Sequence, residues 1–264
     1  MSAWLVGHLP AWLLLIGVIV VVTGLAMLIQ VFFRRRFPGL RGEEHNDVIR
    51  FAFGVIGFVF AFFIGFVVSA MWGQINDADG RARTEGAAGV QLASHLDVFD
   101  KPDSDRIRNA LLAYEQAAVT EWNETAKGQS YPPADQALNS LRSAYEQVQA
   151  RTDVQKTILA NSFTDLDSLS QARTQRVLQA RTDVGPPWSL WAVILLTGGL
   201  LLGCAIIYGV EKPATHFTMV AILGLLVGTI LFLVMMLAHP FIGEIATSPE
   251  PLREVIRVVS NSPL

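Results

Sequence analysis

Four long apolar runs are the feature that most constrains the fold of this chain. They are Pro10–Phe33, Phe51–Trp72, Trp188–Val210 and Phe217–Ala238, each 22 to 24 residues long. A helix rises about 1.5 Å per residue and a bilayer core is about 30 Å thick, so each run is long enough to cross a membrane once. None of the runs contains Lys, Arg, Asp or Glu. The sequence therefore predicts a four-pass membrane protein and argues against a soluble enzyme.

Composition agrees with a chain that is partly dissolved in lipid. Hydrophobic residues make up 52% of the sequence, charged residues 16%, and the mean hydropathy is +0.40. Arginines outnumber lysines 16 to 4, which we interpret as the bias of a GC-rich bacterial genome. The lone cysteine, Cys204, excludes an intramolecular disulfide and a cysteine-based zinc site. The histidines show no metal-ligand spacing. We therefore predict no metal and no cofactor.

The first apolar run is predicted to be a retained span rather than a secretory signal. Residues 1–9 contain no Lys or Arg, and the cluster Arg34–Arg36 follows the run, which is the reverse of a signal peptide. Arg34–Arg36 is also the longest positive cluster in the sequence. Its place at the end of a span is typical of a topology anchor, so it does not indicate binding to nucleic acid.

Basic residues in the short loops predict the orientation. The loop between the first two runs contains Arg34, Arg35, Arg36, Arg41 and Arg50, and the loop between the last two contains Lys212. Short cytoplasmic loops are enriched in Lys and Arg. We therefore expect a multi-pass protein of the plasma (inner) membrane, with both short loops in the cytoplasm and the polar block outside. Arg253 and Arg257 in the tail oppose this orientation weakly.

The polar block between the second and third runs has helical periodicity throughout. Apolar residues recur at three- and four-residue steps from Ile75 to Phe99, which extends the second span out of the membrane. A break is expected at 100–102, after which Asp103 or Ser104 can cap a new helix. A loop is expected at 127–133.

Two further helices are expected in this block, one over 138–148 and one from about Thr152 to Val177. The predicted fold is all-α, a helical bundle inserted into a four-helix membrane protein. The expected regions are 1–72 (spans one and two with the basic loop), 73–186 (polar helical domain) and 187–264 (spans three and four with the tail).

The second span is unusual in two ways. Small residues recur every four positions and form a ridge: Gly57, Ala61, Gly65 and Ser69. Such ridges let helices approach closely in lipid. Phenylalanines recur beside it at one-turn spacing: Phe58, Phe62 and Phe66. Two interpretations stay open, a packing face with lipid-facing aromatics, or a ring of phenylalanines that narrows the pore of an oligomer.

Other candidate sites are weaker. The segment 43–47 (Glu-Glu-His-Asn-Asp) could gather a cation, although a solvated loop beside the arginines is the simpler interpretation. Glu244 follows the fourth span and is either at a pore mouth or a solvated tail carboxylate. The sequence contains no phosphate loop, nucleophile elbow or HExxH motif, so no enzymatic activity is predicted.

Several segments resemble the bestrophin-like membrane family, whose activity is not settled. They are Glu44-His45-Asn46-Asp47, Gly54, Gly57, Phe66-Val67, Trp72, Asp77-Ala78 and Glu85, followed in the tail by 239–244 and Ser248-Pro249-Glu250-Pro251. The layout of four spans with a helical insert is also similar to that family. The resemblance implies the architecture more than an activity.

A more distant resemblance links the chain to the bestrophin anion channels. Those channels are pentamers, their second span lines the pore, and apolar residues one turn apart narrow it, which is the spacing of Phe58, Phe62 and Phe66. Their Asn-Pro-Phe-Gly-Glu-type segment resembles His239, Pro240, Phe241, Gly243 and Glu244, with His in place of Asn and Ile242 inserted. Their calcium-binding acidic run is replaced here by Ile245-Ala246-Thr247, which argues against calcium gating.

The resemblance implies a homo-oligomer in membrane lipid, admits a pentamer, and favours an anion channel. The resemblance and the charge bias disagree about the side of the membrane on which the insert lies. The insert of bestrophins is cytoplasmic, whereas the basic short loops predict that it lies outside, and we follow the charge bias. The alternative function is a non-conducting sensor, scaffold or accessory subunit whose domain 73–186 binds a ligand or a protein partner.

Overall fold

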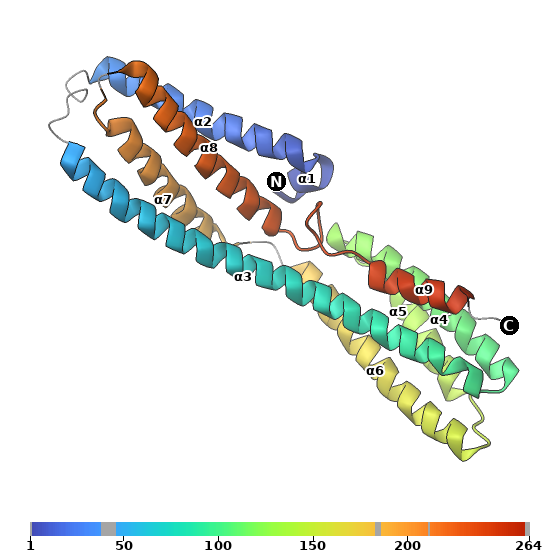
Figure 1. Ribbon diagram of the computed structural model, residues 1–264. Helices are drawn as coiled ribbons and strands as arrows, with labels where there is room; N and C mark the ends of the chain where they lie inside the picture. Colours follow the sequence, from blue (N-terminus) through green and yellow to red (C-terminus); the bar gives the residue numbers. More distant parts are fainter. Residues whose placement is uncertain (1, 38–45, 183–185, 211, 262–264) are drawn as a thin grey trace. The chain divides into compact units, whose positions relative to one another are not determined.

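The computed structural model describes residues 2–37, 46–182, 186–210 and 212–261, which form helices and turns and no strand (Figure 1). The predicted all-α fold, with four helices able to span a membrane and an inserted helical domain, is confirmed. The chain divides into two compact units. The membrane unit comprises Met1–Gln74 and Val184–Ala246, and the helical unit comprises Ile75–Asp183 and Thr247–Leu264.

The membrane unit contains the four apolar helices. They are α2 (Ala11–Arg36), the first part of α3 (Asn46–Ser94), α7 (Trp188–Ile207) and α8 (Pro213–Leu237). Each contains a stretch long and apolar enough to cross a bilayer. A short helix that the sequence analysis did not predict, α1 (Ser2–His8), precedes α2.

In this unit α2 and α8 run side by side in close contact (Figure 1). A Cβ atom on Gly224 would lie 2.9 Å from Thr23 Cα, and one on Gly228 would lie 3.0 Å from Ile19 Cα. Gly224 and Gly228 are four residues apart and form a GxxxG pair, the pattern that lets helix backbones touch in lipid. A small-residue ridge of this kind was predicted on the second span, whereas this pair on α8 was not predicted.

The helical unit consists of the rest of α3, a short 3-10 turn and four further helices. They are η3 (Leu96–Val98), α4 (Lys101–Ala126), α5 (Pro132–Glu146), α6 (Asp153–Thr182) and α9 (Glu250–Asn261). The predicted start of the second helix was wrong, since α4 begins at Lys101 and includes Asp103 and Ser104. Pro102 explains the difference, because its fixed φ suits the first turn of a helix.

The tail helix α9 belongs to the helical unit, whereas we expected residues 247–264 to go with the last two spans. Its apolar stripe, Leu252, Val255 and Val259, is buried. Glycines on α3 make room for it, because a Cβ on Gly86 would lie 2.6 Å from the Pro251 carbonyl oxygen. The spacing of the stripe, at i, i+3 and i+7, was visible in the sequence.

A network of buried ion pairs lies in the core of the helical unit. Arg176 of α6 donates two hydrogen bonds to Glu85 of α3, at 2.7 and 3.0 Å, and the Tyr114 hydroxyl donates a third at 2.8 Å. Arg173, one turn earlier on α6, makes a two-pronged contact with Glu121 of α4 at 2.9 and 2.6 Å. Buried charges persist only when they are paired and hydrogen-bonded in this way, so the network fixes α3, α4 and α6 against each other.

Glu115 is the one carboxyl of this core without a hydrogen-bond partner in the described residues, although it is fully buried. A Cβ on Gly89 would lie 2.6 Å from its Oε1 atom, so the side chain fills the space left by that glycine. Burial raises the pKa of Glu115 well above its usual range, and the charge of Glu85 adds to the shift while Arg176 opposes it. Folding therefore favours the protonated, neutral form of this side chain.

The α2–α8 contact predicts a strong effect of a single methyl group. Gly224→Ala should lower the free energy of unfolding by about 1–3 kcal/mol, because the new Cβ overpacks against backbone that cannot move aside. Gly24→Ala on α2 is the matched control, since its Cβ meets nothing within 4 Å. Thermal unfolding in detergent measures both variants. Equal unfolding temperatures for the two would contradict the close contact.

The Glu115 carboxyl predicts a pH dependence of stability. Between the ordinary glutamate pKa of about 4.3 and its raised native value, the folded protein holds a proton that the unfolded chain has lost. The free energy of unfolding should therefore fall as pH rises through this window. Glu115→Gln should flatten this dependence, so that the variant is more stable than the parent at pH 8 and similar to it at pH 5.

Glu85→Gln is the matched comparison for that variant. The same chemical change there leaves the buried charge of Arg176 with only its 3.3 Å contact to Glu121, and should cost about 3–5 kcal/mol at both pH values. Thermal unfolding of the full-length protein at pH 5 and pH 8 separates the two outcomes. A loss of stability in Glu115→Gln at both pH values would show that this carboxyl is ionised in the folded protein.

Candidate functional site

The phenylalanine stripe of α3 is uncovered within the chain. Phe58, Phe62 and Phe66 are 72%, 74% and 68% exposed, and Phe51, two turns earlier, is 76% exposed. In a soluble protein such a row would be a large apolar patch that needs a partner. In a membrane it meets either lipid or another copy of the chain.

The opposite side of α3 packs inside the chain. Phe60, Ile64, Val67 and Met71 are buried. At about 100° of turn per residue, this buried face is centred about 170° around the helix from the phenylalanine stripe. Phe60 contacts α7, because a Cβ on Gly198 would lie 3.5 Å from its ring. The helix thus has one face fixed to its own chain and an aromatic face directed away from it.

The predicted small-residue ridge lies between these two faces. Gly57 is half-buried, and a Cβ there would make an ordinary contact of 3.6 Å with Leu201 of α7. Ala61, Gly65 and Ser69 are exposed, and a Cβ on Gly65 would meet nothing within 4 Å. Most of the ridge is therefore exposed among the described residues and is accessible to a neighbouring helix.

The segment after α8 folds into a tight turn against the start of the chain. His239 and Pro240 are buried, while Phe241 is half-buried. Gly243 has a φ of +104°, and a Cβ there would lie 2.6 Å from Val6 Cγ1, so only glycine fits. The motif that the sequence analysis singled out therefore shapes this turn beside α1.

Glu244 stands at the end of this turn and contacts the beginning of α2. Its Oε1 atom accepts a hydrogen bond of 3.1 Å from the backbone N–H of Ala11, the first residue of that helix. A carboxylate at a helix N-terminus satisfies a free donor and complements the positive end of the helix dipole. From the sequence, Glu244 was expected either at a pore mouth or as a solvated tail carboxylate. In the structure its side chain is exposed and connects the turn to α2.

Polar contacts at the other end of the membrane helices were not predicted. Asn46, the first residue of α3, is buried and exchanges two hydrogen bonds with the backbone of Gly209, at 2.9 and 2.8 Å. This pair joins the start of α3 to the segment after α7. An asparagine in a loop carries little local signal, and its partner is 163 residues away.

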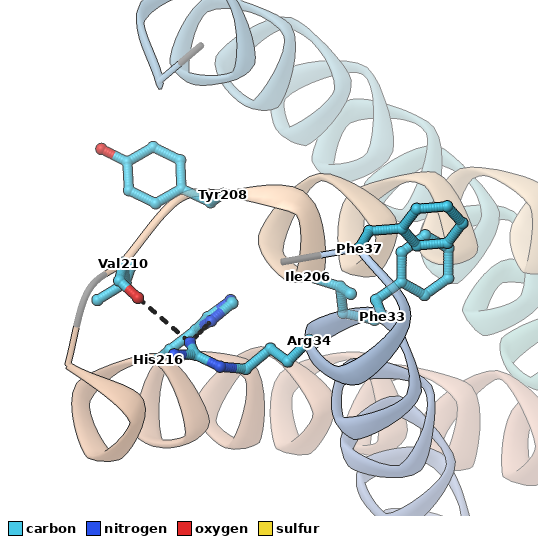
Figure 2. A pocket seen from close by; sticks show the side chains of 7 residues that line it. All are labelled: Phe33, Arg34, Phe37, Ile206, Tyr208, Val210 and His216. Atoms are coloured by element: carbon cyan, nitrogen blue, oxygen red, sulfur yellow. Dashed lines mark hydrogen bonds between the residues drawn. The ribbon is translucent and has the colours of Figure 1, made fainter. Parts of the chain in front are cut away.

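Arg34 makes a second connection at that end, shown in Figure 2. Its guanidinium donates to the His216 Nδ1 atom at 2.8 Å and to the Val210 carbonyl at 3.2 Å, while His216 Nε2 lies 3.0 Å from the Ala205 carbonyl oxygen. The histidine therefore bridges α2 to α7 and α8. The adjoining cavity, about 10 Å³, is of the size that one water molecule needs.

The predicted cation segment at 43–47 lies partly outside the described residues. Asn46 and Asp47 are described, and Asp47 forms an exposed ion pair of 3.7 Å with Arg50. Among the described residues no group of three or more His, Cys, Asp or Glu side chains is arranged to hold a metal ion.

Comparisons with solved structures support the fold. Crystal structures of two variants of a bacterial bestrophin homologue from Klebsiella pneumoniae are similar to this chain, with TM-scores of 0.69 and 0.68. The first shares 14% sequence identity and the match covers 94% of this chain and 99% of that one. The second shares 16% sequence identity, and the match covers 93% of this chain and 97% of that one. At these identities the likeness shows a common fold.

Comparisons of sequence supply the family. A search of curated proteins gave no match. The sequence profile of the bestrophin-like domain matches residues 20–252, which include most of α2, the whole of α3, α7 and α8, and the helical insert. This chain therefore belongs to the bestrophin-like family, as its sequence motifs predicted.

Proposed function

We propose that the protein is a homo-oligomeric anion channel of the plasma membrane, in which α3 lines the pore. One observation carries the proposal: the aromatic stripe of α3 is directed away from the helices of its own chain. Phe58, Phe62 and Phe66 are uncovered, and the face that packs inside the chain lies on the other side of the helix.

An oligomer follows from the number of spans. Each chain supplies a single α3, and one helix cannot enclose a pore. The exposed part of the ridge, Ala61, Gly65 and Ser69, provides a flank on which the α3 of the next copy can pack closely. Copies arranged in this way, a pentamer among them, would turn their phenylalanine stripes toward a common axis.

The chemistry of the stripe favours weakly hydrated anions. Aromatic rings carry partial positive charge on their edges, so ring edges that point into a pore attract anions. A ring of phenyl groups also forms a hydrophobic constriction, which can close by losing its water. The four apolar runs contain no Lys, Arg, Asp, Glu or His, which argues against a proton-coupled transporter.

The mass of the assembly and its chloride flux test this proposal together. Native mass spectrometry from nanodiscs should give one discrete oligomer. In liposomes, Phe62→Ala should raise chloride flux by about tenfold, the effect of lowering a barrier by about 1.4 kcal/mol, because it widens the constriction.

Phe32→Ala on α2 is the control for this experiment. Phe32 is 61% exposed and the same atoms are removed, but we expect this ring to face lipid, so the flux should not change. An assembly that conducts chloride equally with Phe62 and with Ala at that position would contradict the assignment of the pore lining. A monomeric protein would contradict the channel itself.

A polar cleft in the helical unit favours the second candidate function, a sensor or accessory subunit. The cleft is about 260 Å³ and lies between α3 and α6, where it is lined by Arg81, Thr84, Ser168, Gln171, Ala172 and Gln175. Its side chains could hold a small polar ligand. A monomer that does not conduct would favour this function.

We further propose that the helical unit faces outward and the short loops face the cytoplasm, as the arginine bias indicates. Cysteine labelling of intact cells with an impermeant maleimide checks this on a Cys204→Ser background. Gln129→Cys in the helical unit should react directly, and Asp47→Cys at the start of α3 only after lysis. The opposite pattern would show that the membrane topology is inverted.

A further inference from the structure

An apolar groove runs along the membrane unit between α2 and α7. It has a volume of about 320 Å³, and α8 closes it from behind with Val227 and Leu231. Its lining contains no charged residue. Three of the lining residues are glycines of α7, and a Cβ on two of them, Gly199 and Gly203, would meet nothing within 4 Å. These glycines leave the groove open along its length.

The width and length of the groove indicate what kind of molecule it can bind. Along α7 the lining extends from Ile194 to Ile206, which corresponds to about 18 Å of helix. All of the empty space in the groove, about 830 Å³, gives a mean cross-section of about 46 Å² over that length, whereas even a narrow helix, about 10 Å wide, needs about 80 Å². The groove is therefore too thin for a helix of another copy. Its length is close to one leaflet of hydrocarbon, about 15 Å, which is the depth that a single acyl chain occupies.

An arginine stands in line with one end of the groove. Val22, Ile29 and Arg36 of α2 follow one another at intervals of seven residues. A rotation of seven residues is within about 20° of two full turns, so the three side chains lie on the same face of the helix. Val22 and Ile29 line the groove. Arg36 lies about 10 Å beyond Ile29 along the helix axis. It is exposed, and its guanidinium is 5.5 Å from the centre of the Phe37 ring.

Arg35, the neighbouring residue, points elsewhere. One residue corresponds to about 100° of turn, which places Arg35 well away from the face that lines the groove. Like Arg36, it is exposed. The two arginines thus have the same charge at the same depth, and only one of them is aligned with the groove.

We propose that this groove binds one acyl chain of an anionic phospholipid, whose phosphate is held by Arg36. An alkyl chain matches a lining without charged groups, and a guanidinium binds phosphate oxygens through two parallel hydrogen bonds. The site lies on α2 and α7, and it does not depend on α3 lining a pore.

Native mass spectrometry of protein released from nanodiscs tests the proposal. With phosphatidylglycerol, which is anionic, the protein should retain one lipid per chain. With phosphatidylcholine, whose headgroup is zwitterionic, the retained fraction should be at least about tenfold lower, because the headgroup carries no net charge for Arg36 to neutralise. Equal retention of the two lipids would overturn the headgroup assignment.

Two matched pairs of variants locate the site. Arg36→Gln should reduce the retention of phosphatidylglycerol about tenfold, the loss expected for a charge-assisted hydrogen bond, while Arg35→Gln should leave it unchanged. Gly199→Phe should abolish retention by filling the groove, while Gly17→Phe should not, since Gly17 is an open glycine of α2 outside the groove.

Each pair also has an outcome that contradicts the proposal. If Arg36→Gln and Arg35→Gln lowered the retention of phosphatidylglycerol equally, the lipid would be attracted by the general positive charge of this surface and not bound by Arg36. Retention that survives Gly199→Phe would place the lipid elsewhere. The retained mass identifies a lipid occupant directly. An assembly that retains no phosphatidylglycerol and that loses subunits in Gly199→Phe but not in Gly17→Phe would show that a second copy of the chain occupies this face. A changed unfolding temperature in Gly199→Phe would be separated from a binding effect by comparison with Gly17→Phe.

Discussion

The bilayer removes the usual reason for helices to pack, and the membrane unit is organised around that constraint. A leucine is as well solvated by lipid tails as by another helix, so helices associate in a membrane through close approach and polar contacts rather than through expulsion of water. Gly224 and Gly228 provide the close approach between α8 and α2. The Asn46–Gly209 pair, the Arg34–His216 contact and the Glu244–Ala11 contact provide the polar connections, and all of them lie at helix ends, where water can solvate what remains unpaired.

The helical unit solves the packing problem differently because it buries polar groups as well as apolar ones. Its apolar core is formed by stripes such as that of α9, while the Glu85–Arg176 and Glu121–Arg173 pairs fix which helices are neighbours. A buried ion pair adds little net stability, but any other arrangement of the helices would leave one of its charges unpaired. Glu115 fits the same logic, since burial and the neighbouring charge of Glu85 raise its pKa and make an additional negative charge there costly.

The sequence was sufficient to predict what depends on local composition. Span length and the absence of charge identified the four membrane helices, and periodicity identified the bundle. It was insufficient where the partner is distant: Glu85 is 91 residues from Arg176, and nothing near either residue reveals the pair. Glu85 entered the sequence analysis only as part of a family resemblance. The α9 helix was not predicted, although its apolar stripe at Leu252, Val255 and Val259 has a spacing of i, i+3 and i+7 that was visible in the sequence.

The distribution of small residues connects the proposals to the fold. Where a glycine is in contact with another helix, as Gly224 is, it holds the chain together. Gly65 and Gly199 are in spans too, yet a Cβ on either would meet nothing, so neither is needed for packing within one chain. They lie on different helices, Gly65 beside the aromatic stripe of α3 and Gly199 in the apolar groove of α7. In a bilayer the space above an open glycine is filled by whatever approaches closely, and the surroundings determine what that is. A ridge beside an aromatic stripe suits another helix, whereas a groove of about 320 Å³ that points to an arginine suits a lipid.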